Sequence, residues 1–364
     1  MTDKHLWVII MAGGLGSRFW PISNTDCPKQ FIDITGVGRS MLKLTVERFE
    51  KLCSLEHIVI VTGEAYVDRV HQKVPGLAEW QVIGEPMRRN TAPCVACAAA
   101  VIARRDPDAT VIVSPADHAI FRQERFFADL RQAVQTATEH RWIVTLGAQP
   151  TRPDTSYGYI QFREPSAANN TLPDNLFEVV TFTEKPPVEM ARQFIASGEF
   201  FWNTGLLVWT LPVLQEAYRK YLPALWEAFF NSAPGTDHAS LEEVYSQCES
   251  VSIDHGIMEK ADGVYVLAAS FGWSDVETWD SLYDVYRHDQ NGNTMLGGNV
   301  FTYDTHNCMV ALPNVPGKTV VLEGLDGYIV AASEDILMVC RRSSEEKIFK
   351  FANDVELKQL IDKK

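Results

Sequence analysis

The stretch from Val8 to Pro21 reads VIIMAGGLGSRFWP, and it joins an apolar run to three glycines and one positive charge, Arg18. The apolar run predicts a buried strand over Trp7–Met11. In an open α/β sheet, ligands bind at the carboxyl ends of the strands, which is where the glycine-rich segment begins. Glycines let backbone N–H groups approach phosphate oxygens, and arginine adds a charged donor fork. The stretch therefore predicts phosphate binding, with a plain strand-to-helix turn as the alternative.

Two common phosphate-binding loops do not fit this chain. The Rossmann pattern G-x-G-x-x-G needs a third glycine where Phe19 stands. A Walker loop would end at Gly317-Lys318-Thr319, but its first glycine position is Leu312 and a strand follows. The glycine-rich stretch thus belongs to another class of loop.

The first half of the chain alternates strand and helix patterns, which indicates a mostly parallel sheet with both faces covered. Strands are expected at 7–11, 57–62, 81–83, 110–114 and 142–146, and helices at 41–52, 64–74, 91–105 and 124–139, with Thr91 as an N-cap. Further strands are expected at 159–162, 177–182 and 205–209, and helices near 188–197 and 214–230. From about residue 291, short β-rich pieces separated by turn residues recur, and a polar helix over 344–362 follows. We therefore expect an α/β domain over 1–286 and a short β-rich domain over 287–364.

The charge balance of the chain restricts the kinds of molecule that it can bind. Lys and Arg number 33 against 47 Asp and Glu, and the net charge of −14 argues against a broad nucleic-acid or anionic-membrane surface. The first apolar run is too short to span a membrane and no cleavage site follows it. The seven cysteines are scattered, and Cys94 and Cys97 lie in an alanine-rich helical run, so we interpret them as buried side chains rather than a redox or zinc pair. A reducing cytoplasm is the expected location.

Two aspartates follow apolar runs from distant parts of the chain. Asp117 comes after TVIVS, and Asp275 comes after VYVLAASF. Two carboxylates can hold one Mg²⁺, which prefers oxygen ligands and shares its octahedron with phosphates and water. The alternatives are a loop or cap role for Asp117 and an N-cap role for Asp275, on a helix beginning near Glu277.

A series of motifs resembles the sugar-phosphate nucleotidyltransferases, and in particular their mannose-1-phosphate guanylyltransferase branch. The first motif is AGGLGSRFWPISNTDCPKQF, which places Lys29 after a proline. The others, in order, are EPMRRNTAP at 85–93, PADH at 115–118, YGYI at 157–160, FTEKP at 182–186, WNTG at 202–205, SID at 252–254 and WSDV at 273–276. The resemblance covers about residues 5 to 340.

The resemblance implies a Rossmann-like, GT-A-like catalytic domain with a mostly parallel mixed sheet, and an abbreviated left-handed β-helix-like C-terminal domain. It implies transfer of GMP from GTP to α-D-mannose 1-phosphate with Mg²⁺ as cofactor, and a homodimer. Positioning and electrostatics should dominate such a reaction, since no covalent enzyme intermediate is needed. No cluster typical of the fused isomerase domain of longer relatives is present, so guanylyltransferase activity alone is expected.

The resemblance also assigns roles to residues. It makes Arg18, Lys29, Asp117 and Asp275 catalytic, with the two aspartates as metal ligands. The expected nucleotide-binding residues are Met11, Ala12, Gly13, Gly14, Gly16, Ser17, Glu85, Arg89, Asn90, Thr91 and Pro115. The expected substrate-binding residues are Gly158, Tyr159, Glu184, Lys185, Asn203 and Asp254.

Two other functions stay open at this point. One is a sister enzyme that uses another nucleotide or another hexose 1-phosphate, such as glucose 1-phosphate. The other is a non-catalytic sugar-nucleotide-binding or regulatory relative. The block E-P-x-x-R-N-T-A-P and the Phe-Trp-Pro step favour the guanylyltransferase, and a non-catalytic relative has little need of the four catalytic residues together.

Overall fold

The computed structural model describes residues 4–14, 19–34, 36–164, 172–232, 235, 237–312 and 319–362. It divides into two compact units, each built from several segments. The sheet unit comprises Met1–Gly13, Val46–Ala116 and Ile120–Trp273, and the C-terminal unit comprises Gly14–Thr45, Asp117–Ala119 and Ser274–Lys364. The chain passes between them after Gly13 and after Ala116, and also within helix α1 (Met41–Phe49) and the short strands β5 (Ala119–Ile120) and β11 (Trp273–Ser274). The boundary near residue 286 stays a proposal, and it falls just after helix α9 (Trp279–Val285).

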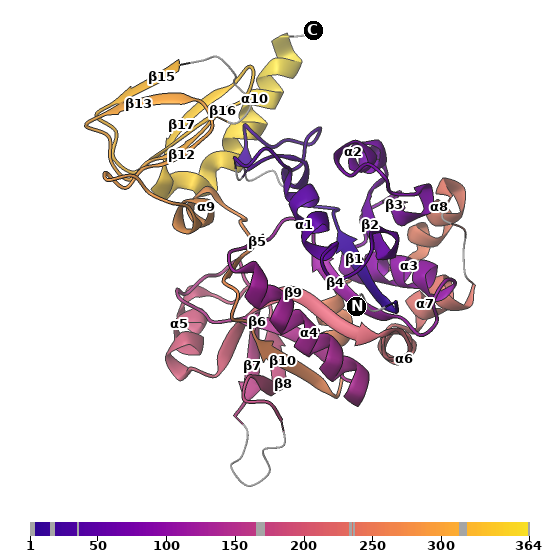
Figure 1. Ribbon diagram of the computed structural model, residues 1–364. Helices are drawn as coiled ribbons and strands as arrows, with labels where there is room; N and C mark the ends of the chain where they lie inside the picture. Colours follow the sequence, from indigo (N-terminus) through magenta and orange to yellow (C-terminus); the bar gives the residue numbers. More distant parts are fainter. Residues whose placement is uncertain are drawn as a thin grey trace. The chain divides into compact units, whose positions relative to one another are not determined.

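The sheet unit is organised around a nine-stranded mixed sheet (Figure 1). Its order is β3 (Val82–Glu85), β2 (Ile58–Gly63), β1 (Leu6–Met11), β4 (Thr110–Pro115), β9 (Phe200–Thr210), β6 (Ile143–Ala148), β10 (Val264–Ala268), β8 (Leu176–Thr183) and β7 (Tyr159–Arg163). The first four strands are parallel, and β9 enters antiparallel between β4 and β6. The expected α/β fold is confirmed. The parallel strands lie on one side of β9, and on its other side, among the described strands, only the pair β6 and β10 is parallel.

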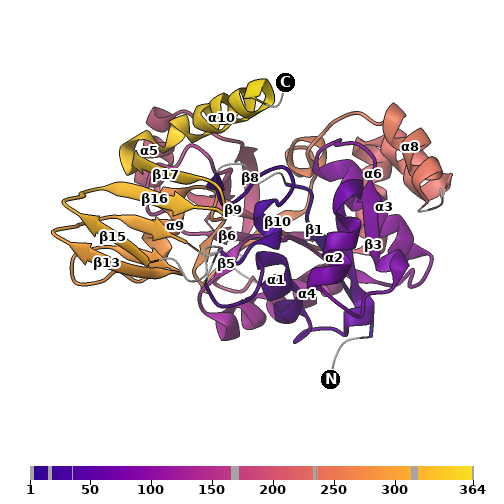
Figure 2. The same ribbon diagram turned by 90° about the horizontal axis from the view of Figure 1, so that it is seen from above.

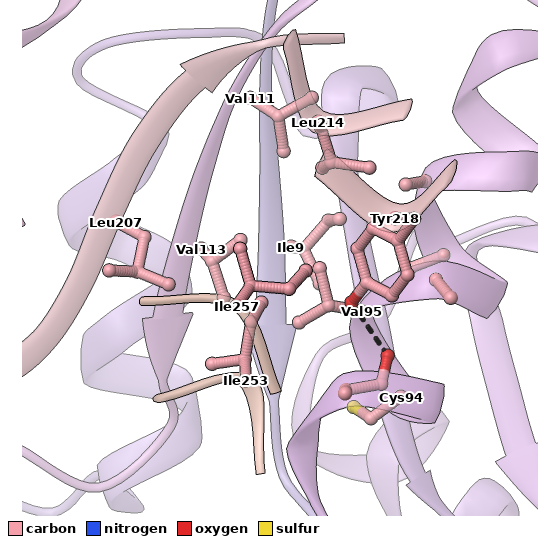
Figure 3. Close-up of a cluster of buried hydrophobic side chains, with 14 of the residues drawn as sticks. Ile9, Cys94, Val95, Val111, Val113, Leu207, Leu214, Tyr218, Ile253 and Ile257 are labelled. Carbon is pink, nitrogen blue, oxygen red and sulfur yellow. Dashed lines mark hydrogen bonds between the residues drawn. The ribbon is translucent and has the colours of Figure 1, made fainter. Parts of the chain in front are cut away.

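The parallel strands are apolar throughout because both faces of the sheet are covered. Alternate residues of a strand point to opposite faces. Ile9, Val95 and Val113 belong to one buried cluster (Figure 3). The cluster also contains Tyr218 of helix α6 (Leu211–Tyr221). Val8 and Ile10, which alternate with Ile9, are also fully buried. A continuous apolar strand is the expected outcome of such burial.

Helices connect and cover these strands. Their bounds are α2 (Val67–Lys73), α3 (Thr91–Ala103), α4 (Gln123–His140), α5 (Val188–Ser197), α6 (Leu211–Tyr221), α7 (Pro223–Trp226) and α8 (His238–Gln247), and a π-helical turn, η7, spans Asp254–Met258. The expected helix over 214–230 is divided by Pro223, which begins α7. Cys94 and Cys97 are free and buried in α3, as expected. The predicted N-cap at Thr91 is wrong: Asn90 is the N-cap and its side chain accepts from the Thr91 N–H at 2.9 Å, because Thr91 already has helical backbone.

Within the described residues, the C-terminal unit includes six strands of short length and one long helix (Figure 2). A four-stranded sheet has the order β12 (Thr294–Leu296), β14 (Met309–Ala311), β16 (Tyr328–Ala332) and β17 (Leu337–Arg341), and β13 (Asn299–Tyr303) pairs with β15 (Thr319–Glu323). All these pairs are parallel except β16 with β17, as in short stacked rungs. Helix α10 covers Ile348–Asp362. The expected strand-rich C-terminal region is confirmed.

The C-terminal unit buries residues from both ends of its sequence in one core. Phe19 and Trp20 of the opening motif are 1% and 7% exposed, and they cluster with Trp279 and with strand residues such as Met309. The Phe19 and Trp279 rings meet edge to face with centroids 5.1 Å apart. The Phe-Trp-Pro step, which carried the resemblance, thus has a packing role.

Among the helices of the described ranges, none is long and apolar enough to cross a membrane.

Candidate active site

Two hydrogen bonds fix the backbone at Ala12, which directly follows β1 and precedes the glycine segment. The Ala12 N–H donates to the Val61 carbonyl at 2.7 Å, and the Thr62 hydroxyl donates to the Ala12 carbonyl at 3.0 Å. Met11 is paired with Pro115 at the same edge of the sheet. Among the described residues, no heavy atom lies within 4 Å of the position that a Cβ on Gly14 would take. The expected phosphate-binding residues Gly16, Ser17 and Arg18 lie outside the described residues.

Lys29 is the centre of the candidate catalytic group in the C-terminal unit. Its side chain is only 6% exposed, and its ammonium lies 2.9 Å from Oδ2 of Asp117. It also donates to the backbone carbonyls of Asp275 and Val276, both at 3.0 Å. An ammonium has three N–H groups, so these three acceptors match its donors. Lys29, Asp117 and Asp275 thus lie together, with Asp275 joined through its backbone, and their expected catalytic roles stay predictions.

The turn after Asp275 has an unusual backbone. Val276 adopts φ 48°, in the left-handed region that a β-branched residue rarely enters. Such a conformation costs on the order of 1–3 kcal/mol and persists only where the surroundings fix it. Here Val276 is buried and the two carbonyls that flank its α-carbon accept from Lys29. The N-cap alternative for Asp275 is wrong, because Thr278 caps α9 and accepts from the Ser281 N–H at 3.0 Å.

The donor set fits a divalent cation of the magnesium type. Lys29 holds the pKa of Asp117 below its ordinary value, although burial acts in the opposite direction, so this carboxylate is ionised. Across the described segments, no group of three or more His, Cys, Asp or Glu side chains is arranged to hold a metal ion. Mg²⁺ is commonly bound through one or two carboxylates, with phosphates and water completing its shell. The carboxylates of Asp117 and Asp275 have the chemistry that such an ion binds, and their role as metal ligands stays a prediction.

The neighbouring residue Gln30 was missed by the sequence analysis as a site residue. It is 2% exposed, and its amide donates to the carbonyl of Gly14 at 2.9 Å. The motif Lys-Gln-Phe thus fixes the start of the glycine segment as well as the aspartates. The available signal was its position inside the motif, between Lys29 and Phe31.

Glu85 lies beside the glycine segment within the sheet unit. Its Oε2 is 3.4 Å from the position of a Cβ built on Gly13, and its Oε1 accepts from the Tyr245 hydroxyl at 3.1 Å. Burial raises the pKa of Glu85 to about 7, against the opposing effects of the Tyr245 hydrogen bond and the Arg88 charge. A titratable carboxyl group therefore lies beside Gly13, and its expected nucleotide-binding role stays a prediction.

Three polar side chains of the block 85–93 form hydrogen bonds within the protein. Arg89 donates to the carbonyls of Tyr245 and Ser246 at 2.9 and 3.3 Å. The Thr91 hydroxyl accepts from the Ile253 N–H at 2.8 Å, and the Asn90 side chain accepts from the Thr91 N–H. The expected nucleotide-binding role of these three side chains remains a prediction, because each already has a protein partner.

Residues expected on the sugar side come together in the sheet unit. The Asn203 amide donates to Oδ1 of Asp254 at 2.9 Å, and the Asn203 N–H donates to the Gly158 carbonyl at 2.8 Å. Burial raises the pKa of Asp254 to about 6, and the charge of Glu184 contributes in the same direction. Gly158, Glu184, Asn203 and Asp254 therefore form one polar group.

Tyr159 has a buried side chain, and its expected substrate-binding role stays a prediction. Its side chain is fully buried with Phe200 and Trp202, and its hydroxyl donates to the Asp154 carbonyl at 2.9 Å. Lys185, which follows Glu184, is exposed and has φ 46°, and its role in phosphate binding stays a prediction.

An α/β unit with a glycine segment after its first strand, acidic residues at the strand ends and a strand-rich C-terminal unit is the architecture of a nucleotidyltransferase. Residues 7–292 match the model of the family described as nucleotidyl transferase. The chain belongs to this family, which confirms the resemblance seen in the motifs.

Several relatives make the match more specific. The chain is 32% identical over 361 residues to the alginate biosynthesis protein AlgA of Pseudomonas aeruginosa, covering 96% of this chain and 72% of that one. It is 32% identical over 365 residues to the mannose-1-phosphate guanylyltransferase of Escherichia coli (strain K12), covering 98% and 74%. A crystal structure from Thermus thermophilus, described as a mannose-1-phosphate geranyltransferase, matches with a TM-score of 0.84 and 30% identity over 97% of this chain and 99% of that chain.

Proposed function

We propose that this chain transfers GMP from GTP to α-D-mannose 1-phosphate, giving GDP-mannose and pyrophosphate. The observation that carries the proposal is the Lys29 group, in which one buried ammonium joins Asp117 to the turn of Asp275. Membership of the nucleotidyl transferase family and the names of the relatives support the choice of substrates.

The reaction needs two anions to be aligned and the developing charge to be stabilised. A phosphate oxygen of mannose 1-phosphate forms a bond to the α-phosphorus of GTP, while the bond from that phosphorus to the bridging oxygen breaks and pyrophosphate leaves. Backbone groups after β1 would hold the triphosphate, and the group of Asn203 and Asp254 would accept and donate hydrogen bonds to hydroxyls of the sugar. Mg²⁺ held by Asp117 and Asp275 would withdraw charge from the phosphate oxygens.

Lys29 has a narrower role than a free phosphate-binding lysine. Its three acceptors already lie at 2.9–3.0 Å, so it can contact a phosphate only by giving up one of them. We propose that it chiefly keeps Asp117 ionised and fixes the backbone of Asp275 and Val276. In this way it orients the two carboxylates before substrate binds.

Glu85 supports the preference for GTP. Guanine carries two neighbouring donors on one edge, the N1–H and the 2-amino group, and adenine has no such pair. A carboxylate accepts two hydrogen bonds at once. The position of Glu85 beside Gly13 therefore suits guanine better than adenine.

The test is pyrophosphate release in the presence of Mg²⁺, with GTP, ATP, dTTP and UTP each combined with mannose 1-phosphate and glucose 1-phosphate. We expect release with GTP and mannose 1-phosphate to exceed every other pair by at least about tenfold. A different preferred pair would identify a sister activity. No release in any combination, from folded protein, would favour the binding-only alternative.

We also propose that the chain forms a homodimer through its C-terminal unit. Phe301 of β13 is 48% exposed, its cross-strand partner Val321 of β15 is 62% exposed, and Tyr303 is 59% exposed. An apolar strand surface of this kind favours association with another copy.

Light scattering after size-exclusion chromatography tests the dimer. The double variant Phe301→Glu/Val321→Glu should raise the dissociation constant at least about tenfold. Val180→Glu is the control, because Val180 is 47% exposed on β8 of the sheet unit. A wild-type monomer, or equal dissociation constants in wild type and the double variant, would contradict this interface.

A further inference from the structure

We infer that Arg89 and Thr91 are positioning residues for the sugar side, because they fix the segment that carries Asp254. The inference deepens the proposed function and rests on it for the identity of the substrates. The resemblance of the motif EPMRRNTAP assigns Arg89 and Thr91 to nucleotide binding, and we assign their side chains to the sugar side instead.

The segment Cys248–Ser252 has no regular secondary structure, so its backbone groups need partners elsewhere. Val251 is held on both sides: its N–H donates to the Arg89 carbonyl at 3.2 Å, and its carbonyl accepts from the Ala92 N–H at 3.1 Å. Two residues later, the Ile253 N–H donates to the Thr91 hydroxyl at 2.8 Å. The segment is thus attached to the residues at the start of α3.

The start of α3 is suited to hold a peptide segment rather than an anion. The first N–H groups of a helix have no partner inside it. Here the Thr91 N–H is taken by Asn90, the Ala92 N–H by the Val251 carbonyl, and Pro93 has none to offer. The Ala92 carbonyl in turn accepts from the Tyr218 hydroxyl at 2.7 Å, which ties this end of the helix to α6 (Figure 3).

Arg89 extends the attachment to the helix before the segment. Carbonyls in the last turn of a helix lack partners inside it. The Arg89 guanidinium donates to two of them, those of Tyr245 and Ser246 in α8. The Tyr245 hydroxyl donates a hydrogen bond to Glu85, so α8 also contacts the residue that we propose for guanine binding.

The other side of the segment borders an open pocket of about 840 Å³, which Gln247, Cys248, Glu249 and Val251 line together with residues of α6, α7 and α8. Cys248 and Val251 are also buried in the hydrophobic cluster of the sheet unit, so packing and hydrogen bonds hold the segment together. Asp254 begins the π-helical turn directly after Ile253, and it holds the Asn203 amide. A shift of the segment would therefore move the Asp254 carboxylate relative to Asn203 and Gly158.

The test compares Thr91→Val, which keeps the shape but loses the acceptor, with Thr91→Ser, which keeps the hydroxyl. In Thr91→Val, amide hydrogen exchange in the peptide covering 248–258 should rise about fivefold, and the KM for mannose 1-phosphate should rise about three- to tenfold. The KM for GTP should stay within about twofold. Thr91→Ser should return both quantities to near the wild-type values.

A rise in the KM for GTP with the KM for mannose 1-phosphate unchanged would overturn the inference and restore the direct nucleotide role. Unchanged exchange at 248–258 would overturn it as well. The exchange measurement needs no substrate, so it separates this inference from the proposed function, whose failure shows as inactive wild type. Should Thr91→Val fold poorly, Arg89→Met provides the same two measurements at the other attachment.

Discussion

Turnover of the Lys29→Met variant should fall at least about tenfold, which corresponds to about 1.4 kcal/mol of lost transition-state stabilisation. The variant should also be less stable than wild type by about 2 kcal/mol, since the loss of one partner leaves the Asp117 carboxylate and two carbonyls without their donor. We place the stability loss below that of a fully buried ion pair because the Asp117 side chain is 26% exposed. The left-handed conformation of Val276 would lose the hydrogen bonds that flank it.

The measurement combines steady-state turnover, well below the melting temperature of the variant, with urea unfolding. Lys73→Met is the matched control, because Lys73 is an exposed residue at the end of α2. Turnover equal to wild type would refute the role of Lys29 in catalysis. Lost stability with unchanged turnover would reduce it to a structural residue.

The sequence predicted the parallel part of the sheet because its strands are short apolar runs that are buried on both faces. β1, β2 and β4 begin and end within about one residue of the expected ranges. It failed at β9, which spans Phe200–Thr210 where only 205–209 was expected. That strand includes the polar motif WNTG, and its pairing with β4 and β6 is long-range, so no local pattern reveals its length or its direction.

The motifs located the candidate site and were less informative about its side chains. Lys29, Asp117 and Asp275 come together, and so do Asn203 and Asp254, because the motifs mark segments that meet. A motif does not say which way a side chain points. Tyr159 faces the core, and Thr91 faces a segment 162 positions along the chain. The long-range partners that decide these directions are not visible in the local sequence.

Stability as a function of pH should differ between wild type and Glu85→Gln. The pKa of Glu85 in the folded chain is about 7, above its ordinary value of 4.5, because burial disfavours the charged form. A carboxyl group with a raised pKa contributes stability that is complete below its unfolded pKa and is lost as the pH rises through its folded pKa. Between about pH 4.5 and 7, wild type should therefore lose on the order of 3 kcal/mol relative to the variant. Glutamine keeps an acceptor for the Tyr245 hydroxyl and does not titrate.

Unfolding free energies from urea titrations at pH 5, 6, 7 and 8 measure this difference. Asp254, whose pKa is about 6, titrates in both proteins, so subtracting one profile from the other removes its contribution. Glu79→Gln is the control, because the Glu79 side chain is 97% exposed and its replacement should leave the profile parallel to wild type. Parallel profiles for Glu85→Gln as well would mean that water solvates the carboxylate beside Gly13. In that case the Glu85 carboxylate is ionised at neutral pH before a nucleotide binds. Guanine could then donate to it directly, without first removing a proton from the carboxyl group.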